Sequence, residues 1–503
     1  MEIAFVAGDV LHFPFINTLF LVKGVGSLKN GSETQLRANA LKLPSILMQG
    51  ITHIAPAIGL IFSIQFVTSL AGVTTPLSFA IAFVIILTLG LSLNQLARHL
   101  PCAGGYYTYV SRTVHPRAGF LTAWLYFLYD PVGTAINLAF MGFFLQQTLR
   151  VEYGIFFPWW LFFIIAALLI SFLIYRGIEL SAEIMLFLGS AEILIVVALV
   201  VTGLFNPGNG GINFSSYIPS NATSMSGLYL GVVFSIFSFT GFESVAPLAE
   251  ESVNPRKNLP KAILGSILLT GAFYLFCSWA LLIGWGTNDL KSFIDCPESP
   301  TFVLARKLWG GAWILVLLAV FNSIMAVSIA CTNAATRVFF AMGRSESLPR
   351  SLAKIHPVYQ TPVNAIWLQT IITLVVGLGL GFWIGPDQEF FLMAAVTTLG
   401  MIFVYSAGNL GVYRFYRKEH SAEFNLFFHA VFPLFSTIAL IWVGYKSVVP
   451  LPPTPICYAP FVVAGWLILG ILFLTFMYYR GRENWLLKAG QSAYEQELHD
   501  RKS

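Results

Sequence analysis

Two apolar stretches of this sequence contain residues that interrupt an α-helix. The first is Thr52-His53-Ile54-Ala55-Pro56-Ala57-Ile58-Gly59, and the second is Ser238-Phe239-Thr240-Gly241-Phe242-Glu243-Ser244. Proline removes a backbone donor, and glycine lowers the cost of leaving the helix. Backbone groups freed inside a membrane are costly unless protein, water or a ligand pairs with them. Each stretch is therefore a candidate binding site, and the alternative for each is a proline kink with a glycine packing contact.

The chemistry that such a break offers follows from the polarity of the helix. The N-terminus of a half-helix presents N–H groups to an anion such as a carboxylate, and the C-terminus presents carbonyls to a cation such as an ammonium. We see no basic residue near either stretch, which disfavours an anionic ligand. A zwitterionic amino acid, neutral or apolar in its side chain, fits these features best.

Four of the ionisable residues inside apolar stretches are candidates for a function, because burying a charge in the membrane is costly. Glu192 is a candidate to carry a proton, or else a structural carboxylate that bonds between helices. Glu243 could carry protons, or it could accept hydrogen bonds from the unpaired backbone N–H groups beside it. His53 and Asp130, the latter followed by Pro131, could line a pathway or simply bond to neighbouring helices.

The composition indicates which elements position these residues. Only 28 Lys+Arg and 23 Asp+Glu occur in 503 residues, and 10% charge compares with about 25% in a typical soluble domain. Hydrophobic residues make up 57% of the chain, which excludes a soluble enzyme, a disordered chain and a disulfide scaffold. The net charge of +5 is too small to suggest a nucleic-acid partner, and the five cysteines match no metal-ligand spacing, so no metal or cofactor is predicted.

The apolar segments predict an all-α, multi-pass membrane protein, because a spanning helix needs about 20 mostly apolar residues. Twelve segments meet this requirement, at roughly 45–70, 76–99, 117–149, 158–175, 181–204, 227–249, 261–285, 309–341, 363–383, 388–410, 428–447 and 458–479. The two interrupted stretches fall in spans 1 and 6.

The distribution of basic residues predicts the orientation. Lys and Arg are retained on the cytoplasmic side during insertion. With twelve spans and both termini inside, 23 basic residues lie on the cytoplasmic side and 5 on the other. An odd number of spans would spoil this asymmetry. Glu250, Glu251, Arg256 and Lys257 then form a cytoplasmic cluster, either ion-paired as a latch or solvated.

Spans 1 and 6 are the first helices of the two halves of a five-plus-five inverted repeat, and corresponding breaks in two halves point to a transporter's binding site. The predicted division is a cytoplasmic N-terminal segment (1–43), a first repeat of spans 1–5 (44–204), an outer loop (205–226), a second repeat of spans 6–10 (227–411), two extra spans (412–480) and a cytoplasmic tail (481–503).

Several motifs resemble those of the amino acid–polyamine–organocation (APC) permease superfamily, over about residues 43 to 480. The strongest runs from Phe239-Thr240-Gly241-Phe242-Glu243 into Ala249-Glu250-Glu251-Ser252-Val253-Asn254-Pro255-Arg256-Lys257-Asn258-Leu259-Pro260-Lys261-Ala262-Ile263. Others are Leu100-Pro101-Cys102-Ala103-Gly104-Gly105-Tyr106-Tyr107, Asn333-Ala334-Ala335-Thr336-Arg337 with Met342-Gly343-Arg344, and Thr361-Pro362.

The resemblance implies a substrate at broken helices 1 and 6. Its carboxylate would meet Ile54, Ala55, Pro56, Ala57, Ile58 and Gly59, and its ammonium would meet the carbonyls of Phe237, Ser238, Phe239, Thr240, Gly241 and Phe242. Phe239 or Phe237 would gate one side. Many members carry a Gly-Ser-Gly-Ile-Phe-like run in helix 1, whereas this chain has Pro56-Ala57-Ile58-Gly59-Leu60-Ile61-Phe62, with one glycine.

The function implied is secondary transport of an amino acid or related amine across the cell membrane by alternating access, not enzymatic catalysis. Coupling to H⁺ or Na⁺ would involve Glu192 and Glu243 for protons, or the oxygens of Asn322, Ser323 and Thr332 for sodium. These span-8 residues are otherwise ordinary hydrogen-bond partners between helices. The alternatives are an uncoupled amino acid exchanger and a transporter-like nutrient sensor.

Overall fold

The computed structural model describes residues 36–480, and no strand occurs in that range. The helices are α2 (Leu43–Ile54), α3 (Pro56–Ala71), α4 (Thr75–His99), α5 (Tyr106–Thr113), α6 (Pro116–Tyr126), α7 (Asp130–Tyr153), α8 (Trp159–Arg176), α9 (Ile178–Phe205), α10 (Met225–Phe237), α11 (Pro255–Trp285), α12 (Leu290–Ile294), α13 (Pro300–Trp309), α14 (Ile314–Arg344), α15 (Val363–Ile384), α16 (Pro386–Lys418), α17 (Phe432–Val448) and α18 (Ala459–Tyr479). A 3₁₀ segment, Phe242–Glu251, follows α10. The tail 481–503 and most of segment 1–43 lie outside the described residues.

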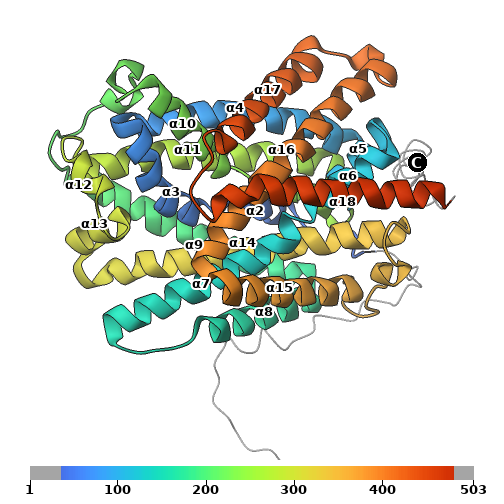
Figure 1. Ribbon diagram of the computed structural model, residues 1–503, viewed down its shortest axis with the longest axis horizontal. Helices are drawn as coiled ribbons and strands as arrows, with labels where there is room; N and C mark the ends of the chain where they lie inside the picture. Colours follow the sequence, from blue (N-terminus) through green and yellow to red (C-terminus); the bar gives the residue numbers. More distant parts are fainter. Residues whose placement is uncertain (1–35, 481–503) are drawn as a thin grey trace, which may run out of the picture.

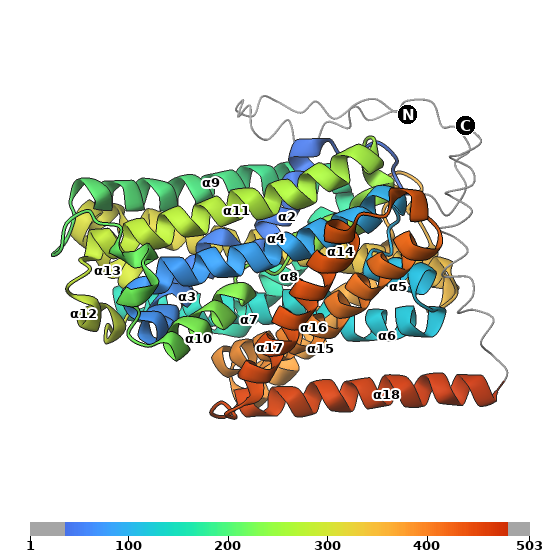
Figure 2. The ribbon, with the colours of Figure 1, turned by 90° about the horizontal axis from the view of Figure 1, so that it is seen from above.

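Eleven apolar helical stretches in 36–480 are long enough to cross a membrane. One of them, Leu43–His99, has 57 residues and turns back at Gly72–Thr74. At 1.5 Å per residue it is far longer than one crossing of about 30 Å, so it holds two spans. Figure 2 shows α3 leading to one end of the bundle and α4 returning from it. The prediction of twelve spans is confirmed, and the inverted repeat stays a prediction.

The predicted span 117–149 is wrong as a single helix. Helix α6 ends at Tyr126, a tight turn follows, and α7 begins at Asp130. Pro131 suits the first turn of a helix because it has no N–H to satisfy there, and an acid is favoured at the same end by the helix dipole. The chain therefore has a third interruption in the membrane, at Phe127–Tyr129.

The helices run mostly along one axis, with the interrupted helices inside the bundle (Figures 1 and 2). Helix α2 packs against α11, α9 and α14, while α7 packs against α14, α15 and α16. Helix α18 lies along one edge of the bundle in Figure 2 and leaves Phe461, Leu472 and Phe476 exposed, as a lipid-facing helix would. The start of α2 and the end of α18 lie at the same end of the bundle.

At the end of the bundle where α2 starts, a buried ion pair links α14 to the 3₁₀ segment that follows α10. Arg337 of α14 donates from Nε and Nη2 to the two carboxylate oxygens of Glu251, at 2.9 and 3.1 Å, and both side chains are fully buried. Leu41 exchanges backbone hydrogen bonds with the same segment, from its N–H to Glu251 O and from Val253 N–H to its own carbonyl, both 2.9 Å. The chain entering span 1 is thereby joined to the chain leaving span 6.

The neighbouring acid, Glu250, makes a second pair. Its carboxylate accepts hydrogen bonds from Arg344 and from the Ala103 N–H at 3.1 Å. Glu250 and Glu251 are therefore both ion-paired, but with arginines of α14. The predicted cluster of these two acids with Arg256 and Lys257 as a latch stays a prediction.

We expect Glu251→Gln to lower the thermal unfolding temperature of the purified protein markedly. Glutamine has nearly the same shape but leaves the Arg337 charge buried and uncompensated, which costs about 3–5 kcal/mol. Glu298→Gln is the matched control, because Glu298 pairs with Arg306 at the surface and its side chain is 53% exposed. That change should cost less than about 1 kcal/mol. Equal unfolding temperatures for the two variants would contradict the structural role of Glu251.

Candidate functional site

The first helix break is centred on Ala55. Helix α2 ends at Ile54, Ala55 adopts the left-handed conformation (φ 54°, ψ 65°), and α3 begins at Pro56. A left-handed non-glycine residue costs about 1–3 kcal/mol and tends to occur at functional sites. Pro56 cannot donate a hydrogen bond back into α2, which explains why the helix stops here. The C-terminus of α2 and the N-terminus of α3 therefore meet in the middle of span 1.

The second break lies between α10 and the 3₁₀ segment. Ser238–Thr240 form tight turns, and Gly241 has φ 126°, a conformation that glycine alone adopts readily. The Gly241 N–H donates to Glu243 Oε2 at 3.1 Å. The Ser238 carbonyl accepts a 2.8 Å hydrogen bond from the Tyr274 hydroxyl of α11. Glu243 and Tyr274 thus satisfy backbone groups that the break sets free.

The two breaks lie against each other. A Cβ atom on Gly241 would lie 2.7 Å from the carbonyl carbon of His53 and 2.8 Å from both His53 O and Ile54 N. The hydroxyl of Ser238 donates to that of Ser63 in α3 at 3.2 Å, which adds a side-chain link between the same two spans. Only a glycine permits this approach, so position 241 joins two segments that are far apart in the sequence.

The predicted substrate-binding residues are mostly buried at this junction. Ile54 to Ile58 and Ser238, Phe239, Gly241 and Phe242 are buried, and Gly59 and Thr240 are partly exposed. Phe239 packs against Tyr274 and Phe83, with ring centroids 4.9 and 6.3 Å away. Phe237 ends α10 and is 36% exposed. Of the two predicted gating rings, Phe239 is the one enclosed beside the breaks.

Glu192 of α9 is fully buried, and its polar neighbour is Ser323 of α14. The Ser323 hydroxyl also accepts a long 3.4 Å hydrogen bond from the Ile58 N–H, in the first turn of α3. Spans 1, 5 and 8 therefore meet at this carboxylate. Neither oxygen of Glu192 has a well-formed hydrogen bond within residues 36–480.

The other two residues of span 8 that were predicted as oxygen ligands for sodium, Asn322 and Thr332, make hydrogen bonds to groups other than Glu192. Asn322 donates from Nδ2 to the Leu188 carbonyl at 2.5 Å. The Thr332 hydroxyl donates to Ser328 O at 2.8 Å and lies 3.0 Å from the hydroxyl of Thr134. These contacts are ordinary bonds within and between helices, so among the predicted coupling residues of α14 only Ser323 faces Glu192.

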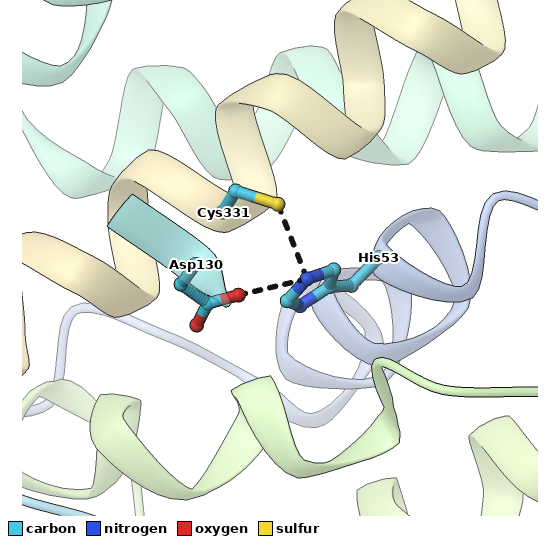
Figure 3. A group of neighbouring side chains, drawn as sticks. All are labelled: His53, Asp130 and Cys331. Atoms are coloured by element: carbon cyan, nitrogen blue, oxygen red, sulfur yellow. Dashed lines mark hydrogen bonds and ion pairs between the residues drawn. The ribbon is translucent and has the colours of Figure 1, made fainter. Parts of the chain in front are cut away.

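His53 and Asp130, which the sequence offered separately, form a pair. His53 Nε2 lies 3.0 Å from Asp130 Oδ1, and the side chains are 3% and 0% exposed. Cys331 Sγ lies 3.2 Å from the same nitrogen (Figure 3). The third helix break places the carboxylate here, because Asp130 is the first residue of α7. In the sequence, this third break is indicated by an Asp-Pro pair inside an apolar run.

A small cavity adjoins this group on the side of the α4–α5 loop. Its walls are Gly104, Tyr106, Tyr107, Tyr126, Glu243, Pro247 and Val338. Burial, and secondarily the charge of Glu243, raises the pKa of Tyr106 well above its usual value. Burial also raises the pKa of Tyr107. Both phenols therefore stay protonated at neutral pH, and the Tyr107 hydroxyl is hydrogen-bonded to Ser345 and Ser347.

Comparison with known proteins identifies the family. A family model of amino acid permeases matches residues 45–488. The chain is 26% identical over 396 residues to the low-affinity putrescine importer PlaP of Escherichia coli (strain K12), covering 76% of this chain and 82% of PlaP. It is 27% identical over 326 residues to the branched-chain amino acid permease BcaP of Bacillus subtilis (strain 168), covering 61% of this chain and 68% of BcaP.

A third relative aligns over nearly the whole length. The methylthioribose transporter of Bacillus subtilis (strain 168) is 23% identical over 485 residues, covering 92% of this chain and 98% of that protein. The broken helices, the motifs and the family match agree. This chain belongs to the amino acid permease family, within the amino acid–polyamine–organocation superfamily.

Proposed function

We propose that this protein is a secondary transporter that moves an amino acid or related amine across the cell membrane by alternating access. The observation that carries the proposal is the contact between the breaks of spans 1 and 6, at Gly241 and the backbone of His53–Ile54. The names of the relatives support the substrate class, because they include a putrescine importer and a branched-chain amino acid permease. The excess of basic residues on one side supports cytoplasmic termini.

The substrate is held, in this proposal, by the backbone at the two breaks. Its carboxylate takes the N–H groups at the start of α3, where Ile58 now makes only the 3.4 Å bond to Ser323. Its ammonium takes the backbone carbonyls of the second break, from Phe237 onward. The Phe237 carbonyl already accepts a hydrogen bond from the Thr240 N–H, and the Ser238 carbonyl accepts one from the Tyr274 hydroxyl. A carbonyl has two lone pairs, however, and can accept a second bond.

We propose Glu192 as the site that couples uptake to protons. It is buried beside Ser323 and the start of α3, so its protonation would alter the surroundings of the proposed carboxylate site. Sodium coupling fits less well, because Asn322 and Thr332 are engaged in other hydrogen bonds. An uncoupled exchanger remains the second candidate, and a nutrient sensor the third.

A ligand screen by thermal shift tests the function directly. The twenty amino acids and a set of amines are added separately to the purified protein, and a true ligand should raise the unfolding temperature by mass action. At a concentration 100 times Kd the stabilisation is about 2.7 kcal/mol. The stabilising compound should then enter proteoliposomes that contain the protein. Binding without uptake would favour the sensor, and the absence of any shift would contradict the transporter.

We expect Gly241→Ala to weaken binding of that compound by at least about tenfold, while the protein still inserts and folds. The added methyl would overlap the His53 backbone, and alanine at φ 126° is strained. Gly379→Ala is the matched control, since a Cβ there meets nothing within 4 Å. Affinity is measured by isothermal titration calorimetry. Wild-type affinity in Gly241→Ala would refute the placement of the site.

Glu192→Gln should abolish uptake driven by a pH gradient in proteoliposomes and leave substrate exchange intact. Glutamine fills the same space but cannot bind and release the proton. Glu389→Gln provides the comparison, because Glu389 of α16 is also fully buried and is not one of the residues at the breaks. If acid-driven uptake by Glu192→Gln equals that of wild type, Glu192 is not the coupling site. Uptake that responds only to a sodium gradient would contradict proton coupling as a whole.

A further inference from the structure

Three side chains that can bind a metal converge at the end of α2. His53 comes from the last turn of α2, Asp130 from the first residue of α7 and Cys331 from the middle of α14. Their ligand atoms all lie within 4.8 Å of one another. The three residues are 5%, 0% and 2% exposed. Figure 3 shows the carboxylate and the sulfur approaching the same nitrogen of the imidazole ring.

Hydrogen bonding alone does not satisfy this group. A ring nitrogen carries either one proton or one lone pair, so Nε2 can make one well-directed hydrogen bond. The contact with Cys331 Sγ has hydrogen-bond geometry. Asp130 Oδ1 lies 3.0 Å from the same nitrogen, within ion-pair distance, but within residues 36–480 no hydrogen bond of good geometry reaches it. A buried carboxylate oxygen without a directed hydrogen bond is destabilising, and a cation bound between the three atoms would coordinate all of them.

The surroundings hold the three ligands in place. The second oxygen of Asp130 accepts a hydrogen bond from the Tyr126 hydroxyl, which fixes the carboxylate. The Tyr129 ring stacks on the imidazole, with centroids 5.5 Å apart and planes 22° apart. Gly133 of α7 lets α14 approach, because a Cβ there would lie 3.2 Å from Cys331 Sγ. Outer contacts of this kind orient the ligands of known metal sites.

We propose that His53, Asp130 and Cys331 form a binding site for a divalent transition-metal ion of the zinc type. Thiolate, imidazole and carboxylate are the ligands that Zn²⁺ takes in proteins, whereas Mg²⁺ and Ca²⁺ prefer oxygen alone. Tetrahedral zinc with ordinary bond lengths sets N and O about 3.3 Å apart and N and S about 3.6 Å apart. The present distances of 3.0 and 3.2 Å need only a small expansion to reach them.

Three protein ligands leave one position of the ion open to water or a small molecule. Tyr126 and Glu243 line the adjoining cavity, which brings polar groups to the edge of the site. Because the ligands come from three helices, a bound ion would tie the end of α2 to α7 and α14. The inference does not depend on the proposed transport activity.

Cobalt titration tests the site. The purified full-length protein, with any affinity tag removed and metals stripped by a chelator, is titrated with Co²⁺ alone. We expect one equivalent to produce a thiolate-to-cobalt charge-transfer band that Zn²⁺ then abolishes by displacement. Cys331→Ser should lack the band and bind Zn²⁺ at least about 100-fold more weakly, since losing an outer contact alone costs 10–100-fold.

Cys277→Ser is the matched control, because Cys277 of α11 is equally buried and outside the group. It should keep the band and the Zn²⁺ affinity. Asp130→Asn should keep the band, because the thiolate remains, but weaken Zn²⁺ binding. A wild-type protein without the band, or a band unchanged in folded Cys331→Ser, would overturn the proposal and leave these residues as a hydrogen-bonded group only.

Discussion

The structure depends on how backbone polar groups are satisfied where three spans are interrupted inside the membrane. An intact helix pairs its own N–H and C=O groups, whereas each break releases several of them where little water is present. Here the freed groups are met by Tyr274 at Ser238, by Glu243 at Gly241 and by Ser323 at Ile58. These partners come from neighbouring helices or from the break itself, so the surrounding bundle must be in place for the breaks to persist.

The contact between breaks 1 and 6 is possible because no side chain separates them. Gly241 lies against the backbone of His53–Ile54, and Gly59 leaves space for the Tyr274 hydroxyl, which a Cβ at position 59 would overlap. The buried pair Glu251–Arg337 fixes the chain beyond the second break, and Leu41 fixes the chain before the first. The pair Glu250–Arg344 is partly exposed, so separating it costs less free energy than separating the buried pair Glu251–Arg337.

Much of this architecture could be predicted from the sequence. Long apolar segments fix the number of spans, and Pro56 and Gly241 mark the two breaks because their backbone chemistry is local. The interruption at Asp130 was missed, since the flanking residues are apolar enough to pass for one helix. Glu250 and Glu251 were recognised as an acidic pair, but their partners Arg344 and Arg337 lie in a distant helix, and sequence spacing carries no information about such contacts.

The convergence of His53, Asp130 and Cys331 could not be foreseen for the same reason. Each residue has an ordinary explanation alone, and the spacing of the cysteines matches no metal motif. In the sequence, Tyr274 likewise looks like an ordinary aromatic residue of an apolar helix. In the structure its hydroxyl donates a hydrogen bond to the Ser238 carbonyl at the second break. Local chemistry thus revealed two of the three interruptions, at Pro56 and Gly241, while only the packed structure shows which side chains meet there.

The most direct test of the central claim is an experimental structure of the protein bound to the compound that it transports. We predict substrate density between Ile54–Gly59 and Phe237–Phe242, with the polar groups of the substrate within hydrogen-bonding distance of the backbone at the two breaks. Density at a different place, with Gly241 still against His53–Ile54, would contradict the claim that the breaks form the binding site.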